Sequence, residues 1–229
     1  MLRLDARPGP LHVDPRQLAV IVIDAQNDFA ARGGMFDRAG IDISGIAAAA
    51  QATRPVLAAA RTAGIPVVYL NMQHAPDLSD AGPPDGPHRL KHRPLALGDA
   101  VEAPNGSPGR ILIRDTWNTE NVPDLAPEPG DVVVTKHRYS GFFETELDDV
   151  LRRLRVTHLL VTGCTTSVCV ESTVRDATFR DYTCVVLEDC TAEPLGTHEA
   201  SLKVIETLFG WVSNTEVVLE ALAQHTDSN

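Results

Sequence analysis

The sequence predicts an α/β fold, a single Rossmann-like domain in which a mostly parallel central sheet lies between two layers of helices. Two observations support this prediction. Short continuous apolar runs, which are typical of strands covered on both faces, recur along the chain. Helical segments separate these runs, and an alternation of strand and helix implies parallel strands joined by right-handed crossovers. The 229 residues show no linker, internal repeat or low-complexity tract, so we assign residues 1–229 to one domain.

The first part of the chain contains two predicted strands with a helix between them. The first strand, Gln17–Ile23, is apolar after its first residue and ends at an aspartate. Helix Ile46–Ala63 is rich in alanine, and we expect Pro55 to kink it and Gly64 to terminate it. The second strand is Ile65–Leu70.

A long polar connection separates this part from the rest of the predicted sheet. Residues 74–130 are rich in proline, glycine and charge, and so long a connection favours a role in building a site. A strand at Asp131–Thr135 and a helix at Glu146–Leu154 follow, with Thr145 as the predicted N-cap. The remaining predicted elements are two strands and then two helices, at His158–Thr162, Thr183–Leu187, Thr197–Phe209 and Thr215–Ala223.

The fourth predicted strand leads into a candidate nucleophile. Gly163 is expected to break the strand, small residues follow, and the pattern becomes helical from Val168. Cys169 would then lie at a strand–turn–helix junction, where the positive end of a helix favours thiolate over thiol. The other three cysteines have plainer interpretations. We expect Cys184 to lie in the core, Cys190 to line a loop, and Cys164 to act through its backbone in the turn.

Three chemically useful side chains fall at the carboxyl ends of predicted strands. Asp24, Lys136 and Cys169 each lie at such an end or in the turn just after it. In open α/β sheets, sites form beyond these ends, so we expect the three to converge. An acid, a cation and a thiol on one rim form a constellation suited to nucleophilic catalysis. Taken singly, Asp24 could cap a turn and Lys136 could be a solvated charge.

The composition limits the classes of partner. The formal net charge of −11 argues against a surface for nucleic acid or anionic membrane. We find no secretory signal and no apolar run of membrane-spanning length, and four cysteines without a disulfide framework fit a reducing cytoplasm. The pair His88 and His92 lacks the companion ligands of a convincing zinc site, so we expect no metal and no other cofactor. We also expect a homo-oligomer, either a dimer or a tetramer.

Three motifs, in order, resemble those of the isochorismatase-like cysteine hydrolases, the superfamily of N-carbamoylsarcosine amidohydrolase and nicotinamidase. They are VIDAQNDF at 22–29, TKHRYSGFFETELD at 135–148 and GCTTSVCVESTVRDA at 163–177. The resemblance covers about residues 16–223 and implies the isochorismatase-like hydrolase fold. It implies that Cys169 is the nucleophile, Asp24 the base that takes the thiol proton, and Lys136 the cation that supports both charges.

The resemblance also implies how the oxyanion is held. It places a cis peptide bond between Cys164 and Thr165, which would direct the Thr165 N–H into the site. This N–H and that of Cys169 would form the oxyanion hole, where one donor contributes on the order of 3–4 kcal/mol to transition-state stabilisation. For substrate contacts, our candidates are Asn71, Trp117 and Tyr139. Packing of the long loop is an alternative role for Trp117, and partial core packing for Tyr139.

Within the superfamily, the likeness is closest to ureidoacrylate amidohydrolases, through RYSGFF at 138–143, CVESTVRDA at 169–177, VVLEDCT at 185–191 and FGWVSN at 209–214. One departure concerns the pocket loop. Those enzymes have a tryptophan soon after the asparagine of the second strand, whereas Asn71 here is followed by Met72, Gln73 and His74. Nicotinamidases carry a metal motif of an aspartate with closely spaced histidines. This sequence has no matching His-x-His, which favours a metal-free hydrolase.

The predicted function is therefore hydrolysis of a C–N bond in a small amide or ureido substrate, most consistent with the ureidoacrylate type. Two alternatives remain open. The same fold could act on biuret, nicotinamide or a streptothricin-type lactam. It could also serve as a non-catalytic binding domain. The presence of Asp24, Lys136 and Cys169 argues against this second alternative.

Overall fold

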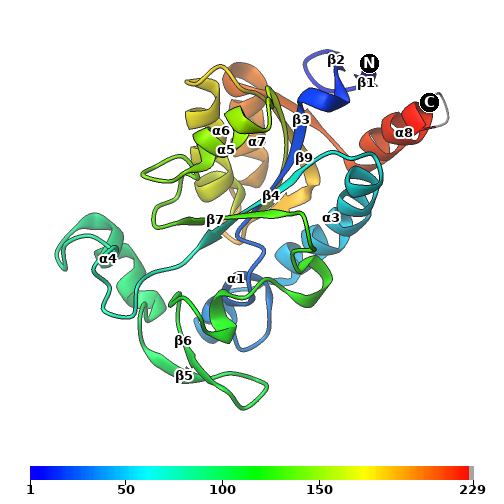
Figure 1. Cartoon of the computed structure of the whole chain (residues 1–229). Coiled ribbons are helices and arrows are strands. Elements are labelled where there is room, and N and C mark those ends of the chain that lie inside the picture. The colour runs from blue at the N-terminus through cyan, green and yellow to red at the C-terminus, as the bar shows by residue number, and fades with distance from the viewer. Residues whose placement is uncertain (227–229) are drawn as a thin grey trace.

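A parallel sheet forms the centre of the computed structural model, which describes residues 1–226 (Figure 1). Within these residues, six strands form this sheet in the order β10-β9-β8-β3-β4-β7, and every neighbouring pair is parallel. The strands are β3 (Leu18–Ile23), β4 (Val67–Met72), β7 (Val132–Lys136), β8 (His158–Cys164), β9 (Thr183–Ala192) and β10 (Trp211–Ser213). The sheet and its helices confirm the predicted α/β class.

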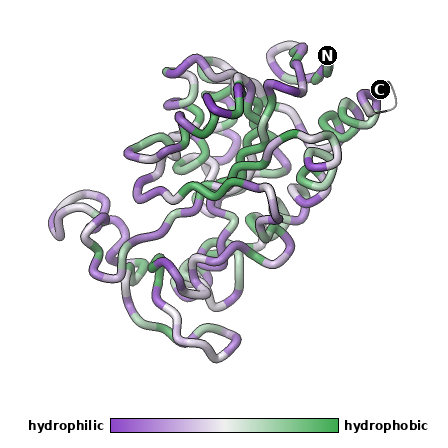
Figure 2. The backbone as a smooth tube through the Cα atoms, viewed as in Figure 1, coloured by the Kyte–Doolittle hydropathy of each residue, from purple (hydrophilic) through white to green (hydrophobic). Residues whose placement is uncertain are grey.

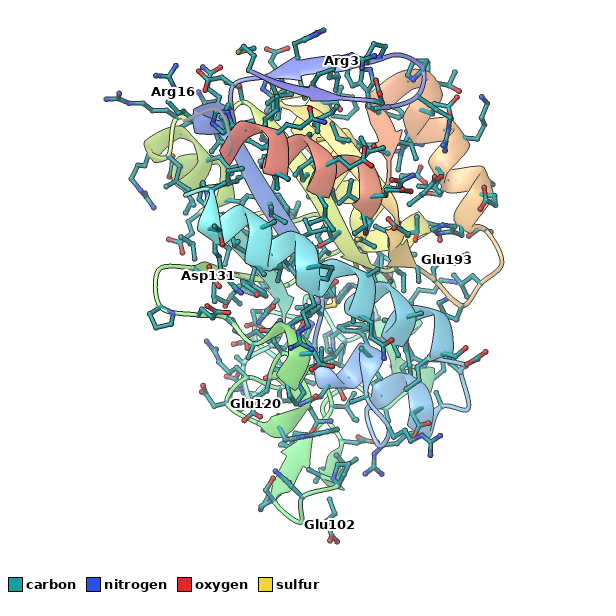
Figure 3. All side chains as sticks on the ribbon, turned by 90° about the vertical axis from the view of Figure 1, so that its right-hand side faces the viewer. Arg3, Arg16, Glu102, Glu120, Asp131 and Glu193 are labelled. Carbon is teal, nitrogen blue, oxygen red and sulfur yellow. The ribbon has the colours of Figure 1, made fainter. Side chains whose placement is uncertain are left out.

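Helices cover both faces of the sheet and complete three layers. On one face lie α3 (Ser44–Thr62) and α8 (Thr215–Thr226), which contact each other and face the viewer in Figure 3. On the other face lie α5 (Leu147–Arg153), α6 (Glu171–Thr178) and α7 (His198–Val204) (Figure 1). Because the crossovers are right-handed, a helix changes face where the chain reverses its direction along the sheet.

The core consists of the strands and the helix faces packed on them. All six residues of β3 are fully buried, as expected for a strand with a helical layer on each side. The hydrophobic stretches of Figure 2 accordingly concentrate in the sheet, whereas the projecting connections are mostly hydrophilic. The charged residues labelled in Figure 3, such as Arg3 and Glu102, lie at the periphery.

Several predicted boundaries differ from the observed ones. Gly163 does not break its strand: β8 continues to Cys164, with a register shift against β9 between Val161 and Gly163. The second strand lies two residues later than predicted, so Asn71 belongs to β4. The helix predicted from Val168 begins instead with a π-helical turn, Thr166–Val170, and a second π-helical turn, Ile205–Phe209, follows α7.

Pro55 lies inside α3 and Gly64 follows the helix with a φ of 69°, as a terminating glycine requires. At α5 the N-cap position is Glu146 rather than Thr145, although the Thr145 hydroxyl accepts a hydrogen bond from the Leu147 N–H. The sequence patterns missed two short elements. These are β10 and an N-terminal hairpin of β1 (Leu2–Leu4) and β2 (Leu11–Val13), followed by a short 3₁₀ turn, Pro15–Gln17.

The long connection is structured and projects beyond the carboxyl ends of the strands (Figure 1). It contains α4 (Pro87–His92), the hairpin of β5 (Ala100–Glu102) and β6 (Pro108–Arg110), and the 3₁₀ turns Arg93–Leu95, Trp117–Thr119 and Pro123–Leu125. Two short helices, α1 (Asn27–Ala30) and α2 (Met35–Arg38), lie at the same end of the molecule. Within residues 1–226, none of the helices has the length and hydropathy of a transmembrane segment.

Candidate active site

Asp24 directly follows β3 and lies at the carboxyl end of the sheet. Its backbone adopts a left-handed conformation with a φ of 51°, which aspartate tolerates better than most residues. The side chain is fully buried, and its Oδ1 accepts a hydrogen bond of 3.0 Å from the Met72 N–H. The end of β4 therefore fixes the orientation of this carboxylate.

Lys136 is the last residue of β7 and reaches the same carboxylate. Its Nζ donates to Asp24 Oδ2 at 2.8 Å and to the Arg138 carbonyl at 3.2 Å. Both side chains of this ion pair are 0% exposed. Strand pairing explains the meeting, because Lys136 lies opposite Met72 in the parallel register of β4 and β7.

Cys169 completes the group from the other side of β3. It lies in the π-helical turn between β8 and α6 and is 4% exposed. Its thiol lies close enough to Asp24 and to the Lys136 ammonium for both charges to shift its pKa. Residues far apart in sequence, each at the end of a strand or just after it, thus meet in one buried cluster of acid, cation and thiol.

Burial dominates the electrostatics of this cluster. It raises the pKa of Asp24, although the Lys136 ammonium opposes the shift, so the carboxylate is a stronger base than an exposed one. For Lys136, burial alone would lower the pKa, but the Asp24 carboxylate and Cys169 outweigh it and the pKa is raised. The lysine therefore stays protonated, and it is the source of positive charge beside the sulfur.

The surroundings of Cys169 oppose the helix-stabilised thiolate expected from the sequence. Burial, and then the negative charge of Asp24, raise the pKa of the Cys169 thiol well above its usual range. The residue also lies inside the π-helical turn rather than at its first position, where the field of a helix N-terminus is strongest. Burial beside Asp24 therefore favours the neutral thiol over the thiolate at Cys169.

The backbone beside Cys169 has an unusual geometry. The structure has a cis peptide bond between Cys164 and Thr165. The Thr165 backbone lies close enough to the Cys169 sulfur to oppose, in part, the rise in its pKa. Gly163, just before, has a φ of 111°, and a Cβ there would lie 2.0 Å from the Ile23 carbonyl oxygen. Only glycine allows β8 to approach β3 this closely.

A cavity of about 280 Å³ opens onto Cys169 and Thr165. Its walls are largely apolar and come from α1, α2, the end of β4 and the region of α4. Ile41, Tyr139, Val168, Pro194 and Leu195 also line the cavity, and Leu195 is 66% exposed. Among the described residues of these walls, Lys91 carries the only full positive charge.

The three predicted substrate contacts lie in different places. Tyr139 lines the cavity. The described residues of the cavity walls do not include Asn71 or Trp117. Asn71 is 6% exposed and donates to Asn121 Oδ1 at 2.7 Å, whereas the Trp117 carbonyl accepts a hydrogen bond from Asn27. The roles of all three residues in substrate binding stay predictions.

Sequence reasoning missed Lys91 and His92, which line the cavity from α4. The available signal was the basic stretch HRLKHR at 88–93, within a chain of net charge −11.

Of the other cysteines, Cys184 lies in the core as predicted. Cys190 does not line a loop, because β9 extends past it and buries it completely. Cys164 ends β8, and its thiol donates to the Asp24 carbonyl.

Comparisons with known proteins identify the family and agree with the fold. The family model of the isochorismatase domain matches residues 18–217. The chain belongs to the isochorismatase family. Among solved structures of this kind, a cysteine hydrolase from Pseudomonas syringae pv. phaseolicola 1448A superposes with a TM-score of 0.77 at 30% identity, covering 93% of this chain and 95% of its own. N-carbamoylsarcosine amidase from Thermoplasma acidophilum has a TM-score of 0.65 at 25% identity, over 87% and 97% of the two chains.

Curated isochorismatase-family relatives share a more specific name. The ureidoacrylate amidohydrolase RutB of Caulobacter vibrioides strain CB 15 is 46% identical over 214 residues, which cover 93% of this chain and 94% of the relative. The ureidoacrylate amidohydrolase RutB of Caulobacter segnis is 45% identical over 93% of this chain and 88% of its own.

Proposed function

We propose that the protein is a cysteine-dependent amidohydrolase of the ureidoacrylate type, which cleaves a C–N bond in a small ureido substrate. The observation that carries this proposal is the buried Asp24–Lys136 pair in contact with the Cys169 thiol, at the inner end of an apolar cavity. Relatives at 46% identity that are named for this activity support the choice of reaction.

In the first half-reaction, the Cys169 sulfur attacks the carbonyl carbon while Asp24 takes the thiol proton. The elevated pKa of Asp24, caused by burial, suits it to this role as general base. The oxyanion that forms is stabilised by the backbone N–H groups of Thr165 and Cys169. Asp24 then returns the proton to the departing nitrogen, the C–N bond breaks, and ammonia or an amine leaves.

In the second half-reaction, water attacks the carbonyl carbon of the thioester-type intermediate. Asp24 takes a proton from this water and returns it to the Cys169 sulfur as the C–S bond breaks, as microscopic reversibility requires. Lys136 remains charged throughout and offsets the negative charge on Asp24 and on the sulfur. All these steps use groups that this chain supplies.

The charge of the cavity supports a carboxylate-bearing substrate. An acidic protein repels an anion, so recognition of one requires a local positive charge. Lys91 is exposed and supplies that charge in a cavity wall that also includes the apolar side chains of Phe29 and Phe36. The ureido group would lie at Cys169, with the carboxylate directed toward Lys91.

The proposal is tested by measuring ammonia release from a panel of ureido acids, biuret, nicotinamide and simple carboxamides, with Cys169→Ala as the control. We expect turnover of the unsaturated ureido acid to exceed that of the neutral amides. Faster hydrolysis of biuret or nicotinamide would reassign the substrate. Equal ammonia release by wild type and Cys169→Ala across the panel would favour a non-catalytic domain.

We further propose that residues 1–229 form one domain that works in the cytoplasm as a homo-oligomer, a dimer or a tetramer. Four free cysteines, all buried, support a reducing compartment. Phe179 and Leu208, each 70% exposed, lie at the end of α6 and in the adjoining π-helical turn, and a second copy would cover such apolar side chains. Light scattering of the purified protein tests the oligomeric state.

A further inference from the structure

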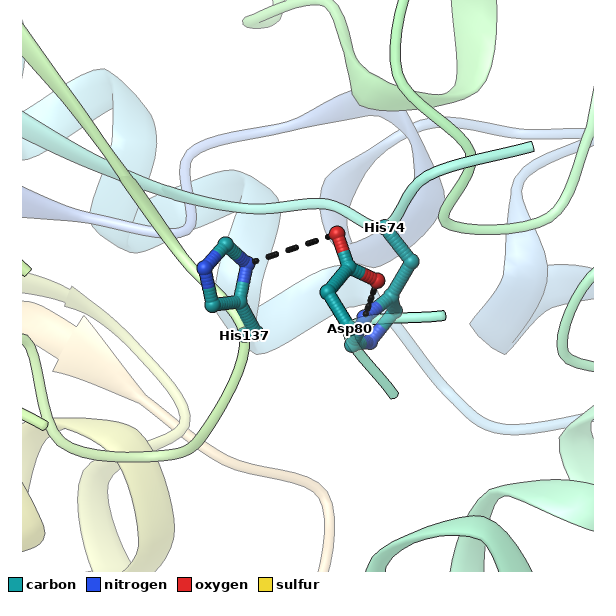
Figure 4. A group of neighbouring side chains, drawn as sticks. All are labelled: His74, Asp80 and His137. Atoms are coloured by element: carbon teal, nitrogen blue, oxygen red, sulfur yellow. Dashed lines mark hydrogen bonds and ion pairs between the residues drawn. The ribbon is translucent and has the colours of Figure 1, made fainter. Parts of the chain in front are cut away.

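We propose that His74, Asp80 and His137 bind a divalent transition-metal cation of the zinc type, at a place separate from the catalytic cavity. Figure 4 shows the three side chains converging, with Asp80 between the two imidazole rings. His74 and Asp80 come from the connection after β4, and His137 comes from the segment after β7. One ligand atom from each residue lies within 4.8 Å of the other two.

The spacing allows the three side chains to share one cation after small rotations. His74 Nδ1 lies 3.2 Å from Asp80 Oδ1, and His137 Nδ1 lies 3.8 Å from Asp80 Oδ2 and 3.5 Å from the Gln73 carbonyl oxygen. Zinc bonds to nitrogen and oxygen are about 2.1 Å long, so neighbouring ligand atoms in a tetrahedron lie about 3.4 Å apart. The two histidines approach different oxygens of the carboxylate, so a cation between them would be held by one or both of these oxygens. Two imidazoles and one carboxylate leave a fourth position for water.

Two of the three ligands are already held in place by other contacts. The His74 side chain is fully buried, and its second ring nitrogen, Nε2, lies 3.4 Å from His88 Nε2. A partner on the second nitrogen is what orients a metal-binding histidine. The Asp80 carboxylate accepts hydrogen bonds of 3.1 and 2.9 Å from the Ala75 N–H. Little reorganisation is therefore needed when a cation binds.

Two arginines lie close to the candidate site and differ in their effect on it. Arg138 donates to the backbone carbonyl of Asp80, so it leaves the carboxylate free. Arg114 Nη2 lies 3.9 Å from Asp80 Oδ2, and its side chain is 46% exposed. Arg114 can therefore turn into solvent when a cation arrives, and we expect it to compete weakly with the metal.

A bound cation would add a link between two parts of the molecule that already meet through the hydrogen bond from Arg138 to the Asp80 carbonyl. It would attach the long connection that carries α4 to the segment after Lys136, beyond the neighbouring strands β4 and β7. The described residues of the cavity walls include none of the three ligands. The role that follows is stabilisation of the connection, with no part in the chemistry at Cys169.

The test uses full-length protein stripped with a chelator and then titrated with Zn²⁺ by calorimetry and with Co²⁺ by visible absorption. We expect one site per chain and, at a hundredfold excess over Kd, a rise in Tm on the order of 5 °C. His137→Gln and Asp80→Asn each remove a ligand and should weaken binding about 100-fold. Arg114→Gln should strengthen binding severalfold, because it removes the competing cation.

His12→Gln is the matched control, since His12 is exposed on β2. It should bind Zn²⁺ as the wild type does. Unchanged affinity in both His137→Gln and Asp80→Asn would overturn the proposal. Loss of the site in Cys169→Ser would also overturn it, because the metal would then be held in the catalytic cavity. These measurements do not depend on turnover, so they are independent of the proposed function.

Discussion

The contact between Lys136 and Asp24 is the one on which the proposed chemistry depends most. Two charges at 2.8 Å, both fully buried, gain strong attraction but lose their hydration. Such a pair adds little net stability compared with apolar side chains of the same volume. We therefore attribute its presence to the reaction, where it sets the charge around the Cys169 sulfur.

Lys136→Met tests this role directly. Removing the ammonium removes the group that lowers the pKa of the Cys169 thiol, so that pKa should rise further and kcat should fall. An unpaired buried carboxylate should also lower the free energy of unfolding by about 3–5 kcal/mol. The pH dependence of Cys169 alkylation, in wild type and variant, measures the effect on the sulfur.

Lys136→Arg is the companion variant. A planar guanidinium does not replace a compact ammonium in a crowded site, so we expect little recovery of activity. If Lys136→Met kept the wild-type alkylation profile together with near-normal turnover, this lysine would be only a strand-end charge, and the assignment of the three catalytic residues would be wrong.

At the scale of elements, the close approach of β8 to β3 positions the nucleophile turn. Gly163→Ala would place a Cβ 2.0 Å from the Ile23 carbonyl oxygen, at a φ of 111°. Gly130 offers a matched control, because its φ is 106° and nothing lies within 4 Å of a Cβ built there. Gly130→Ala therefore reports the backbone cost of positive φ alone.

We expect Gly130→Ala to cost about 1–2 kcal/mol and Gly163→Ala about 1–3 kcal/mol more, because the latter also forces two strands apart. Gly163→Ala should lower kcat as well, since the strand shift moves Thr165 and Cys169. Urea unfolding of both variants measures the difference. Equal losses of stability would show that the approach of β8 to β3 is not tight.

Helix α4 places Lys91 in the cavity wall, and this position predicts that Lys91 contributes to substrate binding. Lys91→Gln should raise KM for a ureido acid about fivefold, with kcat nearly unchanged, because an exposed charge-assisted contact contributes about 1 kcal/mol. KM for a neutral amide should not change. Arg89→Gln alters the same charge on the same helix, and the described cavity walls do not include Arg89, so it serves as the control.

An equal rise of KM in Lys91→Gln and Arg89→Gln would show that the overall positive charge of α4 matters, rather than a specific contact between Lys91 and the substrate. An equal effect of Lys91→Gln on acid and amide substrates would show that Lys91 does not recognise a carboxylate.

At the scale of the whole molecule, Asp28 ties the long connection to the domain. Its carboxylate accepts hydrogen bonds from the Met35 and Leu112 N–H groups and from Asn118 Nδ2. Burial raises the pKa of Asp28 from 3.8 to about 6, because these hydrogen bonds offset only part of the desolvation. The folded protein therefore binds this proton more tightly than the unfolded chain does.

A raised pKa in the folded state gives stability that is fully present below about pH 3.8 and is lost as the pH rises through about 6. Asp28→Asn cannot titrate, so wild type should lose about 3 kcal/mol relative to this variant between pH 3.5 and 7. Denaturant unfolding at several pH values measures this difference. A difference that stayed constant, or that changed in the opposite direction, would show that Asp28 is ionised throughout.

Elements that a short stretch of sequence specifies by itself were predicted correctly. β3 and β8 are apolar runs that need no partner to be recognised, and Asp24 and Lys136 were singled out because sites in open α/β sheets form at strand ends. β10 has three residues, and its strand conformation depends on pairing with β9, so no local pattern marks it.

The contents of the long connection were also beyond local reasoning. α4 is short and strongly basic, and the positions of Lys91 and His74 follow only from how residues 74–130 fold back over the sheet. The influence of burial on the Cys169 thiol was missed for a related reason. Its position along the turn was visible, but its burial beside Asp24 was not.

Covalent capture of the intermediate tests the central claim most directly. The protein is mixed with the unsaturated ureido acid, quenched in acid at early times and digested, and the peptide that contains Cys169 is examined by mass spectrometry. We predict a carbamoyl or acyl adduct on Cys169 that appears before products accumulate and is absent from Cys169→Ala. Turnover with no adduct on Cys169, or an adduct on another residue, would contradict the assignment of Cys169 as the nucleophile.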